Sequence, residues 1–146
     1  MPHNALATGW DLGGAHLKVA QCDAHGSLKF ALQLPCTLWR GLEHLTRAIA
    51  EAQQTIAPPR LHGITMTGEL VDLFSSRREG VARLIETMHK ALPGADLRFY
   101  AGGVGFVPLD TAKDHADAIA SANWHASARF VASRCGSGLF VDVGST

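Results

Sequence analysis

Apolar and polar residues alternate along the first third of the chain, which is the period of a β-strand with one buried face. Three such segments run over residues 5–10, 16–22 and 28–34. They are separated by Asp11-Leu12-Gly13-Gly14 and by Asp23-Ala24-His25-Gly26, which are rich in turn-forming residues. Alternating segments joined by short turns predict an antiparallel meander.

The apolar spacing then changes to steps of three and four residues, which indicates amphipathic helices. Helices are predicted over 42–56 and around 81–88, each followed within a few residues by proline. A third helical region begins at Asp110, the expected N-cap, bends around 121–125 and continues toward Val131.

Three further strands, over 61–66, 97–101 and 139–143, alternate with these helices. The predicted order is therefore three strands followed by helix, strand, helix, strand, helix and strand. Antiparallel strands followed by parallel crossovers predict an α/β fold with a mixed sheet and helices on its faces. No linker-like composition interrupts this pattern, so we expect one domain over most of the chain.

Composition narrows the function classes. A chain of 146 residues, 47% apolar and 18% charged, suits a packed globular domain rather than a disordered one. Thirteen basic residues balance thirteen acidic ones, so no net positive charge draws nucleic acid or an anionic membrane. Without a recognisable signal or membrane segment, and with three cysteines lacking a C-x-x-C pair, we expect free thiols and a cytoplasmic location.

Two similar segments near the chain ends carry the most chemical information. Residues 10–15 and 141–146 both read Asp-x-Gly followed by two small residues, and both follow a predicted strand. Because glycine lets backbone N–H groups approach a ligand closely, such turns can hold phosphate. Asp11 and Asp142 are candidate Mg²⁺ ligands, and Lys18 can neutralise phosphate charge. One such turn alone is also an ordinary hairpin connection, whereas two predict phosphate loops that face each other.

Residues 11–18 resemble the first phosphate loop of the actin-like ATPase, sugar kinase and Hsp70 superfamily, and 142–146 resemble the second. A closer resemblance covers nearly the whole chain. It is carried by the segments GWDLGGAHLK, PCTLWRGL, TMTGELVDLF, REGVARLI and ASANWHASA. These are similar to hydantoinase/oxoprolinase-related proteins of tetrahydromethanopterin-linked one-carbon metabolism. The resemblance implies a ribonuclease H-like, actin-like ATPase lobe.

The same resemblance implies a transferase of methanofuran-type cofactor biosynthesis. Such an enzyme joins an aminomethylfuran methyl diphosphate to the phenol of γ-glutamyltyramine and releases diphosphate. Two alternatives stay open: an ATP-dependent hydantoinase- or oxoprolinase-like hydrolase or small-molecule kinase, and an inactive fragment or binding module. Because a second lobe follows the second loop in the family, we expect 1–138 to be an N-terminal lobe and 139–146 the start of a truncated second lobe. Without the C-terminal lobe as its partner, such a chain is expected to be poorly active.

Residue roles follow from the resemblance. Asp11 is expected to bind Mg²⁺ or orient water, and Lys18 to reach a phosphate oxygen of the diphosphate or of ATP. The alternative for Lys18 is an ordinary exposed strand residue. The remaining expected phosphate contacts come from small residues of the two loops, Gly13 and Gly14 in the first and Gly144, Ser145 and Thr146 in the second.

Thr67-Gly68-Glu69 ends a predicted strand, where open α/β sheets place ligand groups. Thr67 is therefore a candidate substrate ligand, and Glu69 a candidate catalytic base or magnesium partner; a helix-start residue without function is the alternative for Glu69. Arg78 of the Arg77-Arg78 pair can bind a diphosphate or a glutamyl carboxylate bidentately. A solvated helix start explains the two arginines equally simply.

The segment 121–125 gathers polar and aromatic side chains among alanines. Asn123 is a candidate substrate ligand and His125 a second candidate general base. At helical spacing Ser121 and His125 are expected to share one face. Trp124 is expected to point elsewhere and to pack in the core; a platform for substrate is the alternative.

Overall fold

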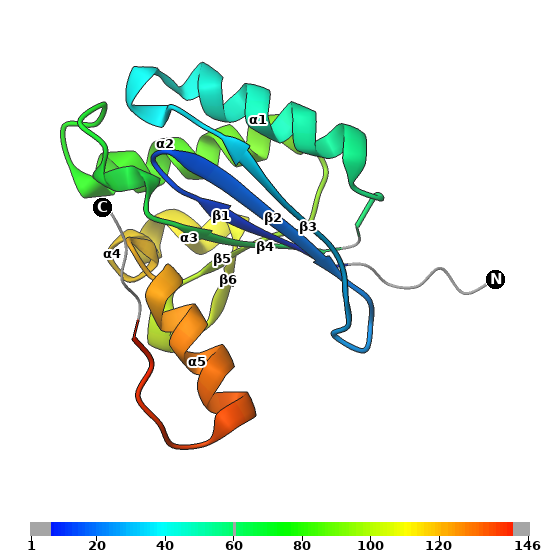
Figure 1. Cartoon of the computed structure of the whole chain (residues 1–146). Coiled ribbons are helices and arrows are strands. Elements are labelled where there is room, and N and C mark those ends of the chain that lie inside the picture. Colours follow the sequence, from blue (N-terminus) through cyan, green and yellow to red (C-terminus); the bar gives the residue numbers. More distant parts are fainter. Residues whose placement is uncertain (1–6, 60, 142–146) are drawn as a thin grey trace.

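A six-stranded mixed sheet organises the residues that the computed structural model describes, 7–59 and 61–141 (Figure 1). In sequence order the strands are β1 (Ala7–Leu12), β2 (His16–Cys22), β3 (Leu28–Pro35), β4 (Leu61–Met66), β5 (Leu97–Tyr100) and β6 (Phe106–Pro108). Their order across the sheet is β3-β2-β1-β4-β5-β6. The strand β1 pairs antiparallel with β2 and parallel with β4, and β4 pairs parallel with β5. The predicted α/β fold with a mixed sheet is confirmed.

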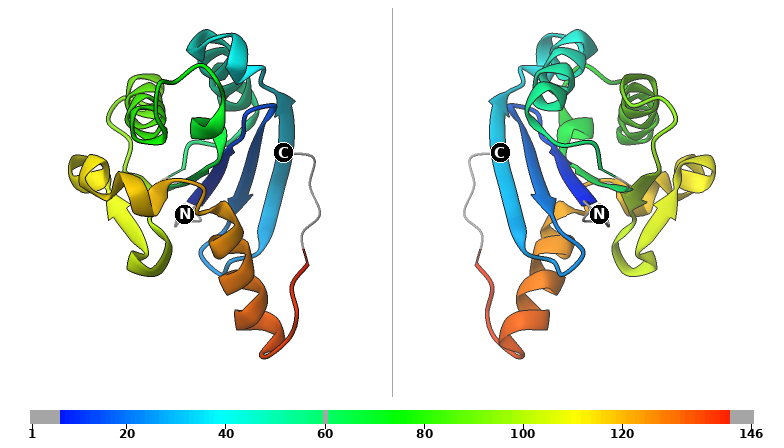
Figure 2. Two further views of the ribbon diagram at one scale, coloured as in Figure 1. Left: turned by 90° about the vertical axis from the view of Figure 1, so that its left-hand side faces the viewer. Right: turned by 90° about the vertical axis from the view of Figure 1, so that its right-hand side faces the viewer.

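Most of the helices pack on one face of this sheet. The helices are α1 (Leu42–Thr55), α2 (Arg77–Ala91), α3 (Leu109–Ala112), α4 (Ala116–Ile119) and α5 (Asn123–Cys135), with short 3₁₀ turns η1 (Leu38–Arg40), η2 (Gly68–Leu70), η3 (Gly102–Val104) and η4 (Lys113–His115). Figure 2 shows α1 and α2 on one side of the strands and α5 extending away from them. None of the helices in the described part of the chain is long and apolar enough to cross a membrane.

The core lies between the sheet and helices α1–α4, and strand alternation selects which residues enter it. In β1, Trp10 and Leu12 are buried, whereas Gly9 is exposed and Asp11 half-buried. The face that carries Gly9 and Asp11 is called the open face below. Its central positions, brought together by strand pairing, are Gly9, Asp11, Lys18, Ala20, Ala31, Gln33, Gly63 and Thr65.

Two boundaries differ from the prediction, and one strand was not predicted. Asp11 and Leu12 belong to β1, so the first turn begins two residues later than expected. The expected N-cap at Asp110 is wrong: the helix begins at Leu109, capped by the extended residue Pro108, and Asp110 lies in its first turn. Pro108 also ends β6, a strand that glycine-rich surroundings concealed in the sequence.

The predicted strand over 139–143 is wrong in its described part. Residues 139–141 form no strand, and Leu139 is 91% exposed. A strand needs a partner for its backbone hydrogen bonds, and no described strand pairs with this segment. Residues 142 and 143 lie outside the described residues.

A buried hydrogen bond joins the neighbouring strands β1 and β4 on the core face of the sheet. The Trp10 Nε1–H donates to Nδ1 of His62 at 2.9 Å, and both side chains are buried. Burial lowers the pKa of His62 below its ordinary value of 6.5, although nearby Asp96 opposes this shift. Because Nδ1 accepts the tryptophan hydrogen bond, the folded protein needs the neutral imidazole.

We therefore predict that the chain becomes less stable as pH falls below the ordinary histidine pKa. Because the pKa of His62 is lower in the folded than in the unfolded state, the unfolded chain takes up the proton first, and stability declines between 6.5 and the lower native value. Denaturant unfolding followed by circular dichroism at about pH 7.5 and about pH 5.5 measures this slope.

The matched variants are His62→Leu and His25→Ala, the latter at an exposed turn position. His62→Leu leaves the tryptophan donor unpaired, so it costs about 1–3 kcal/mol at neutral pH but flattens the pH slope. His25→Ala retains the slope. An unchanged slope in His62→Leu would contradict the assignment.

Candidate functional site

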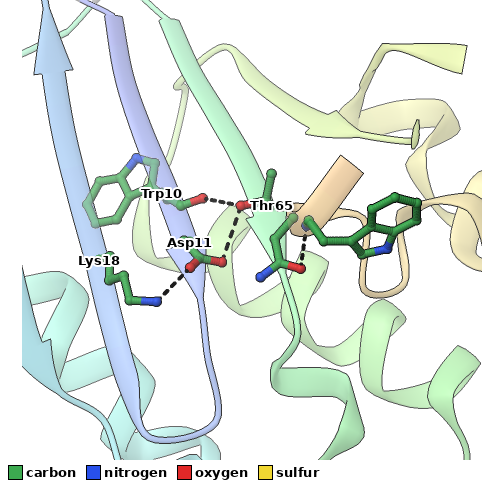
Figure 3. Close-up of polar contacts among 6 residues, drawn as sticks. Trp10, Asp11, Lys18 and Thr65 are labelled. Atoms are coloured by element: carbon green, nitrogen blue, oxygen red, sulfur yellow. Dashed lines mark hydrogen bonds and ion pairs between the residues drawn. The ribbon is translucent and has the colours of Figure 1, made fainter. Parts of the chain in front are cut away.

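Asp11 sits between two polar side chains on the open face (Figure 3). Its register partners are Lys18 on β2 and Thr65 on β4, so all three side chains emerge from one row across the sheet. Lys18 Nζ lies 3.2 Å from Asp11 Oδ2. The Thr65 hydroxyl lies 3.3 Å from Asp11 Oδ1 and 3.4 Å from the Trp10 carbonyl oxygen.

This arrangement leaves binding capacity free. The Lys18 side chain is 56% exposed and that of Asp11 23%, so the ion pair contributes little to stability. An ammonium carries three donors, of which Asp11 takes one. Lys18 can therefore contact an anion while the Asp11 carboxylate retains lone pairs for a cation or a hydroxyl group.

The adjacent Gly13-Gly14 turn is tightly packed rather than loosely open. The Gly13 amide already donates to the His16 carbonyl at 3.0 Å, and the Gly14 carbonyl accepts from the Leu38 amide at 3.0 Å. A Cβ on Gly13 would lie 2.8 Å from the His16 oxygen, and one on Gly14 would lie 2.8 Å from Val71 Cγ1. Close packing requires these glycines, and neither has a positive φ. Among the described residues the Gly14 amide has no acceptor, so it can donate to a ligand.

A hollow of about 630 Å³ opens beside Asp11 and Lys18 on the same face of the sheet. Polar groups line one end, where Gln33 and Thr65 join the charged pair. The rest is apolar and has small residues in its lining. That part is lined by Gly9, Trp10, Val19, Ala20, Ala31, Leu32, Gly63 and Phe106. Its volume falls in the range of small-molecule sites.

Glu69 lies in η2, just beyond the end of β4, and is deeply buried. Its Oε1 accepts a hydrogen bond from the Ser121 hydroxyl at 2.6 Å, and Arg77 lies 3.9 Å away. Its Oε2 is buried and has no partner within the described residues. Ser121 in turn accepts from Arg77 at 3.2 Å. The carboxylate therefore ties η2, the start of α2 and the segment before α5 together.

The other candidates near the sheet edge are placed differently. The Thr67 amide donates to the Leu12 carbonyl at 3.0 Å, which joins the ends of β4 and β1. Arg78 forms an ion pair with Asp117 of α4, and both side chains are largely exposed. Arg78 does not line the hollow beside Asp11.

The polar residues of 121–125 surround the start of α5. His125 Nδ1 lies 2.9 Å from the Tyr100 hydroxyl, which places this end of α5 against β5. The Asn123 side chain accepts from the Trp124 amide at 2.8 Å. Two expectations fail here. Ser121 precedes the helix with a left-handed φ of 54°, so it does not share a helical face with His125. Trp124 is 61% exposed rather than part of the core.

The expected second phosphate loop lies outside the described residues. This applies to its four candidates, Asp142, Gly144, Ser145 and Thr146. Within 7–59 and 61–141 no cluster of three metal-ligating side chains occurs. Asp11 with its hydroxyl neighbour Thr65 suits Mg²⁺ held mainly by substrate phosphates, which commonly uses only one or two protein carboxylates.

Strand register thus brings Asp11 and Lys18 together with Thr65, which sequence reasoning missed. Thr65 is two residues before the candidate Thr67, and only the parallel pairing of β1 with β4 identifies it as the neighbour of Asp11. The structure places Glu69 in a separate contact network with Ser121 and does not place Arg78 beside the charged pair.

Comparison with known proteins finds no family model that matches the chain. The chain is 28% identical over 142 residues to the (4-{4-[2-(gamma-L-glutamylamino)ethyl]phenoxymethyl}furan-2-yl)methanamine synthase of Methanocaldococcus jannaschii. The match covers 97% of this chain and 41% of the synthase. The chain is therefore distantly similar to such a synthase and spans less than half of its length. Membership of the actin-like superfamily stays a prediction.

We predict that Ser121→Ala destabilises the fold because it leaves the buried Glu69 carboxylate without its hydroxyl donor. The expected loss is about 1–3 kcal/mol in the free energy of unfolding. Ser121→Gly also removes the hydroxyl but relieves the left-handed backbone, so its loss should be smaller by roughly 1 kcal/mol.

Urea unfolding of both variants checks this ranking. Ser133→Ala, at an exposed serine of α5, is the control and should stay within about 0.5 kcal/mol of the parent. Equal stability of Ser121→Ala and the parent would show that the hydrogen bond from Ser121 to Glu69 does not contribute to the free energy of unfolding.

Proposed function

We propose that this chain forms the N-terminal lobe of a transferase of methanofuran-type cofactor biosynthesis. In the proposed reaction, an aminomethylfuran methyl diphosphate is joined to the phenol of γ-glutamyltyramine. The observation that carries this proposal is the similarity to the furan-methanamine synthase along 97% of the chain. The name of that synthase describes a product in which a phenoxymethyl group joins an aromatic ring to a furan.

The fold supports the lobe assignment. The order β3-β2-β1-β4-β5, with a glycine turn between β1 and β2, suits the ribonuclease H-like, actin-like architecture that the resemblance implies. We take 1–138 as this lobe and 139–146 as the start of a second lobe. The polar row, formed by Lys18, Asp11 and Thr65, then lies beside the turn where a phosphate group of the substrate would bind.

The proposed reaction requires residues that bind the diphosphate leaving group. We assign the diphosphate to Lys18, whose remaining ammonium donors face the open side, and to the free Gly14 amide. Gly13 supports this turn through its own backbone bond. Asp11 is the proposed Mg²⁺ ligand, with Thr65 holding one carboxylate oxygen in place. Mg²⁺, when bound, supplies charge compensation to the departing diphosphate.

The proposed transfer is a nucleophilic substitution at the methylene carbon that carries the diphosphate. The carbon–oxygen bond to diphosphate breaks, and the phenol oxygen forms a new bond to the same carbon. The leaving group keeps the electron pair, and the phenol proton passes to a base. Charge builds up on the diphosphate, where Lys18 and the turn amide stabilise it.

His125 is the better placed of the two candidate bases. It is only half-buried and its ring bonds the Tyr100 hydroxyl on the open-face side of β5. The Glu69 side chain is fully buried and already bonded to Ser121, so we assign it a positioning role for the segment that leads into α5. Asn123 and Thr67 stay candidate substrate ligands, and Arg78 a candidate for the glutamyl carboxylate.

We predict that Lys18→Met lowers the affinity for magnesium diphosphate by about tenfold or more, because a charge-assisted hydrogen bond is lost. Isothermal titration calorimetry on the 146-residue chain measures this affinity. Lys90→Met is the control, since Lys90 lies on α2 and forms an ion pair with Glu86 of the same helix. Equal loss in both variants, or none in Lys18→Met, would contradict the assigned diphosphate site.

The activity itself is tested by supplying the part of the Methanocaldococcus synthase that lies outside the match as a separate chain. Formation of the furan–phenol ether with release of diphosphate, in the absence of ATP, is the expected result. Strict dependence on ATP would contradict the transferase and indicate an ATP-dependent hydrolase or kinase. Asp11→Asn should lower the turnover and raise the Mg²⁺ concentration that gives the half-maximal rate.

A further inference from the structure

Gly9 is a glycine that the fold itself does not require. It lies in the middle of β1, where glycine is less favourable than alanine by about 0.5–1 kcal/mol. Its φ is not positive, and a Cβ built on it would meet only the Ala20 carbonyl at 3.9 Å, an ordinary contact. Gly13 and Gly14, by contrast, are required by contacts of 2.8 Å. Where no bulge or tight bend explains it, a strand glycine often marks a site that a ligand or another backbone approaches closely.

The hollow on the open face begins where Gly9 lies. Gly9 pairs with Ala20 on one side and with Gly63 on the other, so small residues leave the backbone of three strands accessible there. Phe106 borders the hollow, and the residue is 57% exposed. The Phe106 ring would lie 3.2 Å from a Cβ on Gly63 and meets Tyr100 edge-on at 5.2 Å.

The polar end of the hollow determines how a ligand is oriented. Asp11 and Lys18 are two residues along their strands from Gly9 and Ala20, on the same face. A flat apolar group over Gly9 would therefore have its polar substituent next to the charged pair. The exposed Phe106 ring at the other side favours a planar aromatic group, which it can contact edge-on or offset.

From this geometry we propose that the hollow is a subsite for the aromatic ring of a ligand whose phosphorylated arm lies on Lys18 and Asp11. Gly9 is its specificity-determining residue, because any side chain there occupies the space of the ring. The phosphorylated arm rests on the proposed transferase function, whereas the ring subsite depends only on the hollow and its lining. In the proposed reaction the ring is the furan that carries the diphosphate.

Three probes separate the ring from its arm: benzyl diphosphate, inorganic diphosphate and benzyl alcohol. With Mg²⁺ present, benzyl diphosphate should bind about tenfold or more tightly than inorganic diphosphate, because the ring gains apolar contact in the hollow. Gly9→Val should abolish this advantage and leave the affinity for inorganic diphosphate unchanged. Titration calorimetry on the 146-residue chain measures both affinities.

Two further variants protect the test against a folding defect. Gly9→Ala has room for its Cβ, and should weaken benzyl diphosphate binding in a chain that unfolds no earlier than the parent. Ala7→Val changes the same face of β1 outside the hollow and should leave the ring advantage intact. Equal binding of benzyl and inorganic diphosphate, or an advantage that survives in Gly9→Val, overturns the proposal.

Benzyl alcohol tests the ring subsite without any phosphate. It should shift the amide resonances of Gly9 and Gly63 in the parent chain and not in Gly9→Val; absence of shifts at both glycines overturns the subsite. If these shifts occur but no ether forms in the reconstituted assay, the transferase fails and the subsite stands. If ether forms with the same KM in Gly9→Val, the subsite fails and the transferase stands.

Discussion

The pairing of β1 with both β2 and β4 is the constraint on which the candidate site depends. Antiparallel pairing sets Lys18 beside Asp11, and parallel pairing sets Thr65 on its other side. A shift of one residue in either register would move the partner side chain to the core face. Burial of Trp10 and Leu12 fixes that register, since each flanks Asp11 and packs inward. The core therefore determines the geometry of the polar row.

The same alternation explains why one face of the sheet is packed and the other is not. Helices α1–α4 cover the core face, and α5 approaches the open face near β4 and near β5, where Tyr100 bonds His125. Glu69 anchors the chain just before α5 through Ser121. This leaves the part of the open face over β1–β3 free to form the hollow beside Asp11. Binding capacity and packing thus occupy opposite faces of one sheet.

Local patterns were sufficient to predict most elements, because the strands β2 and β3 have alternating sequences bounded by turns or proline. The strand β6 was missed because three residues beside a glycine-rich turn carry no detectable period. The predicted strand over 139–143 has suitable residues but, in its described part, no partner. A sequence pattern shows that a segment can pair, and tertiary contacts decide whether it does.

For the site, the sequence identified Asp11 and Lys18 because they flank one recognisable turn. Thr65 and Gly9 could not be identified, since their importance comes from lateral pairing and from the absence of a side chain over the hollow. Ser121 was wrongly expected to share a helical face with His125, because its own left-handed backbone interrupts the helix before α5 begins. Trp124 was wrongly expected in the core, because it lies on an exposed side of α5. Helical spacing applies only within one continuous helix.

A crystal structure of the 146-residue chain with magnesium and benzyl diphosphate tests the central claim most directly, because it locates both ends of the ligand. We expect phosphate oxygens at Lys18 Nζ, the metal at Asp11 and the ring over Gly9. Density for the diphosphate at the exposed Arg77-Arg78 surface, with Lys18 still bonded only to Asp11 and the hollow empty, would contradict it.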